Sequence, residues 1–95
     1  AQHLGRRIAE EMQGKPVDRI RQAWETCLSR PPTEAETSRL VQFYDEMIEA
    51  YGRDRSAASA MLGDMSVPDD RVVETAAWAA VGRVLLNLDE LITRG

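Results

Sequence analysis

Apolar residues recur at intervals of three and four along nearly the whole chain, and over no useful length do they alternate with polar residues. This interval places side chains on one face of an α-helix, whereas alternation is typical of a half-buried strand. Glycine and proline interrupt the pattern and divide it into segments at about 2–13, 16–29, 33–51, 54–62 and 69–92. The sequence therefore predicts an all-α, single-domain bundle of four to five helices over residues 1–95.

The first boundaries are marked by prolines and by one capping pattern. Pro16 fits the first turn of a helix, where its missing N–H costs nothing. Pro31 disfavours the α conformation in the residue before it, so the second helix is expected to stop at about Ser29. Thr33 and Glu36 have the spacing of a capping box, which predicts the start of the third helix.

The later boundaries depend on glycine and on acidic or hydroxyl caps. Gly52 predicts the end of the third helix, as a C′ residue that adopts a left-handed conformation. Either Asp54 or Ser56 is expected to cap a short fourth helix that ends at about Leu62. The pair Asp69-Asp70 is expected at the start of the fifth helix, where the helix dipole favours anions.

The fifth segment has the longest apolar stripe and is predicted to be the central helix. That stripe comprises Val73, Ala77, Ala80, Val81, Val84, Leu85, Leu88 and Ile92. Trp24 and Trp78 lie on apolar faces and are expected in the core rather than at an interface. Asn87 has two interpretations: it either anchors a buried hydrogen bond that fixes the docking of the last helix, or it is a solvent-facing or helix-bending residue.

Residues that could support catalysis are few and scattered. The single cysteine, Cys27, excludes an internal disulfide and a multi-cysteine zinc site, and on an apolar stripe it is expected to be an inert small hydrophobe. The only histidine, His3, lies near the chain end, where little orients it as a base for a nucleophile. We therefore expect no catalytic residue, and the chain is predicted not to be an enzyme.

Cofactor and metal sites are not expected either. A non-covalent haem would need His3 together with a methionine ligand, but the methionines are spaced like core residues. They are Met12, Met47, Met61 and Met65. Residues 54–64 lack the glycine and the terminal glutamate of a calcium loop, and the glycines are too isolated for a phosphate loop. The sequence thus predicts no cofactor-binding residue and no metal ligand.

Charge and hydropathy limit the classes of partner. The net charge is −4, and residues 31–70 carry nine acidic and three basic side chains. Such a segment repels phosphate, so a nucleic-acid partner is not expected. The longest run of small or apolar residues, Ala76–Gly82, falls far short of the ~20 residues that span a bilayer, so membrane insertion is not expected.

Two stretches of the sequence resemble a known family. Cys27–Glu36 reads CLSRPPTEAE, and Thr75–Glu90 reads TAAWAAVGRVLLNLDE. Both resemble the planctomycete-type domain of unknown function found at the C-terminus of large cytochrome c-containing proteins. The opening AQHL followed by RRI is similar to the preceding helix of that family, so the resemblance covers almost the whole chain and corresponds to the C-terminal portion of the family domain. The chain departs from the family pattern at Leu91, where an aromatic residue often stands, and at Gly82, where alanine is common.

The resemblance implies an accessory helical module of a larger, multidomain protein that is exported to the periplasm or cell envelope and carries haem domains upstream. Its motifs have no assigned catalytic role. The start at Ala1, without an initiator methionine or a signal pattern, agrees with the expectation that further sequence precedes it.

Two functions follow as expectations. The first is a non-enzymatic structural or protein-interaction module, whose partner is the upstream part of the same polypeptide or another protein. The alternative is an accessory domain that completes the active site of an upstream catalytic or electron-transfer domain, with Arg30, Asp89 or Glu90 at the junction. Whether these residues and Asn87 face solvent or a cleft distinguishes a functional from a structural role. The sequence leaves the oligomeric state open.

Overall fold

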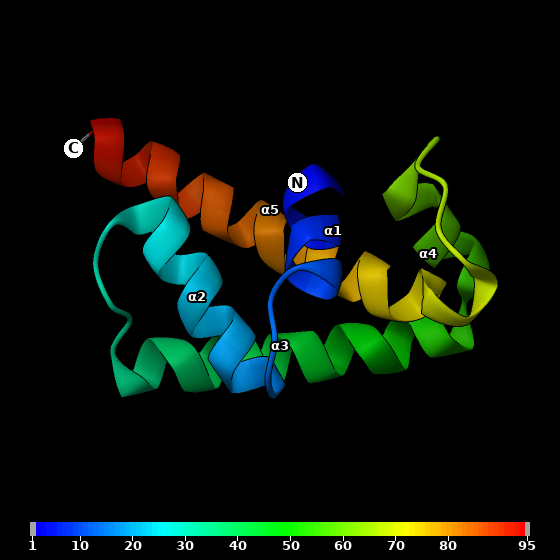
Figure 1. Cartoon of the computed structure of the whole chain (residues 1–95), viewed down its shortest axis with the longest axis horizontal. Coiled ribbons are helices and arrows are strands. Elements are labelled where there is room, and N and C mark those ends of the chain that lie inside the picture. The colour runs from blue at the N-terminus through cyan, green and yellow to red at the C-terminus, as the bar shows by residue number, and fades with distance from the viewer. Residues whose placement is uncertain (1, 95) are drawn as a thin grey trace.

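The helices are arranged around the last one, α5, which spans Val72–Arg94 (Figure 1). The computed structural model describes residues 2–94, with side chains described as far as residue 88. Before α5 come α1 (Gln2–Glu10), α2 (Pro16–Leu28), α3 (Glu34–Arg53), α4 (Arg55–Leu62) and a 3₁₀ turn, η1 (Asp69–Arg71). Between residues 2 and 94 there is no strand. The predicted all-α bundle is confirmed.

The central position of α5 is also confirmed. It contacts each of the four other α-helices, and every residue from 75 to 82 is buried. The expected stripe covered only part of the buried surface of α5. Sequence periodicity identifies one buried face of a helix, whereas α5 is enclosed on several faces. Small side chains such as Ala76 and Ala79, which are fully buried, let the neighbouring helices approach it closely.

Three residues of the expected stripe, Val73, Val84 and Leu88, are only half-buried. Val84 and Leu88 pack against the larger cluster, whereas at the start of α5 it is Val72 and not Val73 that is buried. Val72 stands one helical turn before Ala76 and therefore shares its face, which packs against Ala58 and Leu62 of α4. The side chain of Ile92 lies outside those that the structure describes.

Two apolar clusters make up the core. The larger joins α1, α2, α3 and α5 and consists of Ile8, Met12, Ile20, Ala23, Trp24, Leu40, Tyr44, Ala77, Trp78, Val81 and Leu85. The smaller lies between α4 and the start of α5 and consists of Ala58, Leu62, Val72 and Ala76. Trp24 and Trp78 are 2% and 0% exposed, so the prediction that both belong to the core is confirmed.

Helix α1 lies directly against the backbone of α5 at Gly5. A Cβ atom placed on Gly5 would overlap the backbone nitrogen and the Cα atom of Ala79. Glycine is thus required here for close approach rather than for a turn. The contact brings Ile8, which is fully buried, into the larger cluster.

The chain leaves α1 earlier than expected. The helix ends at Glu10, and the amides of Glu11 and Met12 both donate to the Arg7 carbonyl. This shared acceptor closes the last turn, so the segment to Gly14 is a loop, with Gly14 at φ +105°. Pro16 then occupies the first turn of α2 as predicted.

The end of α3 differs from the prediction that Gly52 terminates it. Gly52 lies inside the helix, which continues to Arg53, and the turn is made by Asp54. The Asp54 amide donates to the Ala50 carbonyl at the end of α3, while its carboxylate accepts from the Ala57 amide of α4 at 3.1 Å. A residue that caps both helices removes the need for a left-handed glycine.

The remaining boundaries agree with the sequence in position. Helix α2 ends at Leu28, followed by Ser29 in a left-handed conformation with φ +57°. Helix α4 ends at Leu62, with Gly63 at φ +62°. The pair Asp69-Asp70 lies in η1, just before α5, rather than in the first turn of the α-helix itself.

Among the described residues, no helix combines the length and the apolar composition that crossing a bilayer requires.

Substituting two helical glycines, Gly5 and Gly52, tests the close approach of α1 to α5. We expect Gly5→Ala to lower the free energy of unfolding by about 1–3 kcal/mol, because the new Cβ forces α1 away from α5. Gly52→Ala is the matched control: a Cβ there meets nothing within 4 Å, so the higher helix propensity of alanine should stabilise the protein by about 0.5–1 kcal/mol. Urea unfolding measures both, and equal effects at the two positions would contradict the packing argument.

Candidate functional site

The turn between α2 and α3 contains the strongest group of polar contacts near the first family-like stretch. The Thr33 hydroxyl accepts from the Glu36 amide at 3.1 Å, and the Glu36 carboxylate accepts from the Thr33 amide at 2.9 Å. This is the reciprocal capping box that the sequence predicts. It satisfies amides that the start of α3 would otherwise leave unpaired.

Arg30, one of the candidate site residues, completes this group. Its two terminal nitrogens donate to the two carboxylate oxygens of Glu36, at 3.1 Å and 3.0 Å. This side-chain bond, followed by the backbone bond from Thr33, lowers the pKa of Glu36 from its ordinary 4.5 to about 2. The same pairing raises the pKa of Arg30. Glu36 therefore holds both the helix cap and the arginine while it is ionised.

The guanidinium of Arg30 also lies over the indole of Trp24, with its central carbon 5.0 Å from the ring centroid. A guanidinium in this position is attracted to the ring face. The side chain is 45% exposed, so Arg30 closes the end of the core toward solvent. These contacts assign it a structural role at the turn.

The other candidates lie on the last helix. Asn87 is exposed, so of its two interpretations the solvent-facing one is confirmed. The side chains of Asp89 and Glu90 lie outside those that the structure describes.

An aromatic pair lies at the centre of the larger cluster. The rings of Tyr44 and Trp78 stack, with centroids 4.0 Å apart. Burial, followed by the nearby charge of Glu74, raises the pKa of Tyr44 to about 12. Arg19 bridges to Glu74 at 3.4 Å and so joins α2 to α5 beside this pair. Tyr44 is thus a neutral phenol under ordinary conditions.

Both tryptophans bury an indole N–H that has no hydrogen-bond partner among the described residues. Leaving a buried donor unpaired costs free energy, and the apolar contacts of the rings must offset that cost. The sequence gives a weak signal of this arrangement, since both tryptophans fall on stripes with few polar neighbours.

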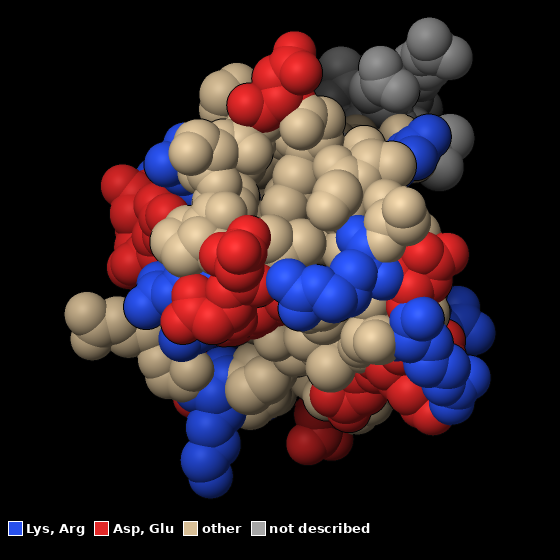
Figure 2. All heavy atoms as spheres, turned by 90° about the vertical axis from the view of Figure 1, so that its right-hand side faces the viewer, with Lys and Arg blue, Asp and Glu red and all other residues tan. Residues whose placement is uncertain are grey.

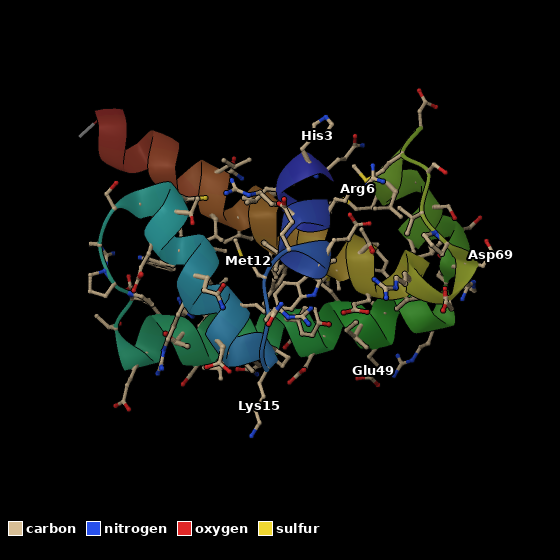
Figure 3. The ribbon with its side chains drawn as sticks, viewed as in Figure 1. His3, Arg6, Met12, Lys15, Glu49 and Asp69 are labelled. Atoms are coloured by element: carbon tan, nitrogen blue, oxygen red, sulfur yellow. The ribbon has the colours of Figure 1, made fainter. Side chains whose placement is uncertain are left out.

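The structure places the haem-ligand candidates at the surface and against both apolar clusters. His3 is exposed on the first turn of α1, and Figure 3 shows it at the outer end of that helix. Met12 and Met47 belong to or pack against the larger cluster. Met61 and Met65 pack against the smaller cluster, and Met61 also lines an open surface hollow with His3. Cys27 is half-buried against the larger cluster.

The potential metal-ligating side chains of the described residues lie apart from one another. Within the described part of the chain, no three His, Cys, Asp or Glu side chains gather as a metal site would require.

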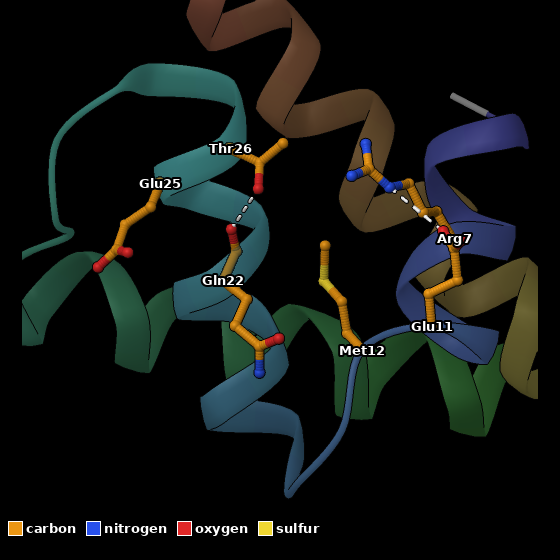
Figure 4. A pocket seen from close by; sticks show the side chains of 6 residues that line it. All are labelled: Arg7, Glu11, Met12, Gln22, Glu25 and Thr26. Carbon is orange, nitrogen blue, oxygen red and sulfur yellow. Dashed lines mark hydrogen bonds and ion pairs between the residues drawn. The ribbon is translucent and has the colours of Figure 1, made fainter.

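Sequence reasoning missed a hollow of about 550 Å³ between the end of α1 and the middle of α2 (Figure 4). It is lined by Arg7, Glu11, Met12, Gln22, Glu25 and Thr26. Arg7 pairs with Glu11 at 3.3 Å on one side, and Thr26 donates to the Gln22 carbonyl on the other. The lining comes from two helices whose separation depends on tertiary packing, so no local pattern reports it.

Comparison with known proteins adds no relative. No family model, no curated protein and no solved structure matches this chain. The resemblance to the planctomycete-type domain stays a prediction drawn from the two sequence stretches.

Removing the Thr33 hydroxyl tests the cap. We expect Thr33→Ala to lower the free energy of unfolding by about 0.5–2 kcal/mol, because the Glu36 amide loses its acceptor. Thr26→Ala is the control, since Thr26 is exposed in the last turn of α2 and caps no helix start, and surface changes of this kind stay within about 0.5 kcal/mol. Thermal or urea unfolding followed by circular dichroism gives both values. A neutral Thr33→Ala would mean that the cap does not hold α3.

The lowered pKa of Glu36 predicts an acid-dependent loss of stability. The carboxyl is more acidic when folded, so its contribution is present above pH 4.5 and is lost as the pH falls toward 2. The difference in unfolding free energy between wild type and Glu36→Gln should therefore shrink across that window. Glu34→Gln removes a carboxylate from the same turn as a control. A difference for Glu36→Gln that stays constant from pH 5 to pH 2 would overturn the assignment.

Proposed function

We propose that this chain is a non-enzymatic structural or protein-interaction module of a larger exported, cytochrome-linked protein, as the family resemblance implies. Its partner is the upstream part of the same polypeptide. The periplasm or cell envelope is the proposed location, on the same basis.

The observation that carries this proposal is the placement of Arg30. A residue that completes a neighbour's active site needs its charged group available. Here the guanidinium is held by both oxygens of Glu36 and by the ring of Trp24. Presenting Arg30 to a substrate would require breaking its fork with Glu36. The alternative, an accessory to an upstream active site, receives no support from this residue.

The groups with displaced pKa values favour the same interpretation. Strongly displaced values in a cleft are typical of catalytic groups. Glu36 and Tyr44 owe theirs to a helix cap and to a buried aromatic stack. Each displacement thus has a structural cause.

The apolar surface of α5 favours docking. Leu86 is the one large apolar side chain described as exposed, at 39%. It stands seven residues after Ala79 and therefore on the same face of α5 that α1 covers at Gly5. A partner that packs there would bury Leu86.

A cleavage experiment tests the proposal. A protease site is placed immediately before residue 1 of the parent polypeptide, and the cut protein is passed over an affinity tag on the C-terminal segment. We expect the upstream part to stay bound to the tagged segment after the cut. Once the two parts are separated, the upstream part should keep its rate of haem reduction. Dissociation on cleavage contradicts the docking role.

The same preparation separates the two candidate functions. The accessory function is correct if three results are found together. Removing the segment abolishes haem reduction, adding back the wild-type segment restores it, and adding a folded Arg30→Gln segment does not. Arg39→Gln, an exposed arginine of α3, is the control for loss of one positive charge.

A further inference from the structure

A second hollow lies where the first turn of α1 meets α4 and the middle of α5. Its volume is about 440 Å³, and it is lined by Gln2, His3, Ala60, Met61 and Arg83. The Gln2 side-chain amide donates to the Met61 carbonyl at 3.2 Å and so joins α1 to α4 at its edge. Three helices therefore fix the positions of residues that lie far apart in the sequence.

The lining contains cationic or donor groups and no acid. Arg83 is exposed, and among the described residues it makes no ion pair. The arginines of α1 differ, because Arg6 and Arg7 pair with Glu10 and Glu11, at 3.4 Å and 3.3 Å. Arg83 thus retains the planar set of donors that matches a carboxylate.

Part of the lining of the hollow is apolar. Ala60 and Met61 come from α4, and Met61 packs against the smaller cluster. A small inorganic anion would make no use of these two side chains, whereas the methylene groups of an acidic side chain would cover them. The combination of apolar side chains with donor groups in one hollow matches an amphipathic ligand.

An adjoining hollow is less favourable for a carboxylate than the hollow that contains Arg83. It shares Gln2 and His3 and is also lined by Arg6, Gly63, Asp64, Met65 and Ser66. Asp64 repels a carboxylate from that side, and the charge of Arg6 is offset by Glu10. The face of the molecule in Figure 2 carries both acidic and basic side chains beside one another, with uncharged surface between them. Attraction of an anion is therefore local to the hollow that contains Arg83.

We propose that this hollow docks an acidic segment of a partner polypeptide, with a carboxylate side chain held by Arg83 and His3 and its methylene groups on Met61. The side-chain oxygen of Gln2, which accepts no hydrogen bond among the described residues, is placed to accept a backbone N–H of that segment. The inference rests on the proposed docking function and names the chemistry of the partner.

Titration with a defined peptide tests the site without the parent protein. The probe is acetyl-Leu-Glu-Leu-Glu-amide, followed by two-dimensional NMR of the 95-residue chain. Signals of Gln2, His3, Met61 and Arg83 should move together. Arg83→Gln should weaken binding about fivefold, as for loss of one partly exposed charge pair. Arg83→Lys should be intermediate, because it keeps the charge and loses the fork.

Two controls make the result specific. Arg39→Gln, the same change of charge on α3, should leave the affinity unchanged. Sodium phosphate at equal ionic strength should bind more weakly than the peptide. Phosphate binding as tight as the peptide, an unaffected Arg83→Gln, or signal changes elsewhere on the surface would each overturn the inference.

The cleavage experiment distinguishes this inference from the proposed function. Docking of the parent that survives Arg83→Gln refutes the acidic-segment site and leaves the module function intact. Loss of all docking by the wild-type segment refutes the module function, and the peptide titration still decides whether the hollow binds carboxylates.

Discussion

The contact between α1 and α5 at Gly5 is the constraint on which the surface of this protein depends. With no side chain between them, the two backbones meet at Ala79, and α1 can seat Ile8 and Met12 in the larger cluster. The same close approach fixes the distance between the axes of α1 and α5. Each of the hollows described at the surface of α1 has one wall formed by this helix. A bulkier residue at position 5 would move all of those walls together.

The turn between α2 and α3 is held by a different kind of interaction. There the chain turns at Pro31 and Pro32, and the angle between α2 and α3 depends on a single carboxylate. Glu36 closes the cap of α3 and grips Arg30, which in turn covers Trp24. A surface ion pair alone contributes little to stability. This one matters because it connects a helix start to a core ring, so that turn chemistry and packing favour the same geometry.

Local signals predicted much of the fold. Pro16, the Thr33 and Glu36 box and the burial of both tryptophans depend on the residues themselves and their near neighbours, and all three are confirmed. The prediction that Gly52 ends the third helix was wrong because Asp54, two residues later, caps two helices at once. A left-handed residue is therefore not needed there. Local pattern also gave no sign of the close approach at Gly5 or of the meeting of His3 with Arg83. Both depend on how α1 crosses α5, and that crossing is decided by contacts between opposite ends of the chain.

The position of α1 has a consequence for the order of folding. Its main neighbour, α5, is the last helix of the chain, so α1 can dock only after a loop that contains α2, α3 and α4 has closed. Closing a long loop costs conformational entropy before its contacts are gained, and non-local contacts of this kind are typical of late steps. Contacts between helices that are neighbours in the sequence, such as α2 with α3, close shorter loops and cost less entropy. We therefore expect the amide protons of α1 to exchange with solvent faster than those at the centre of α5, as a unit that opens while the rest of the bundle stays closed.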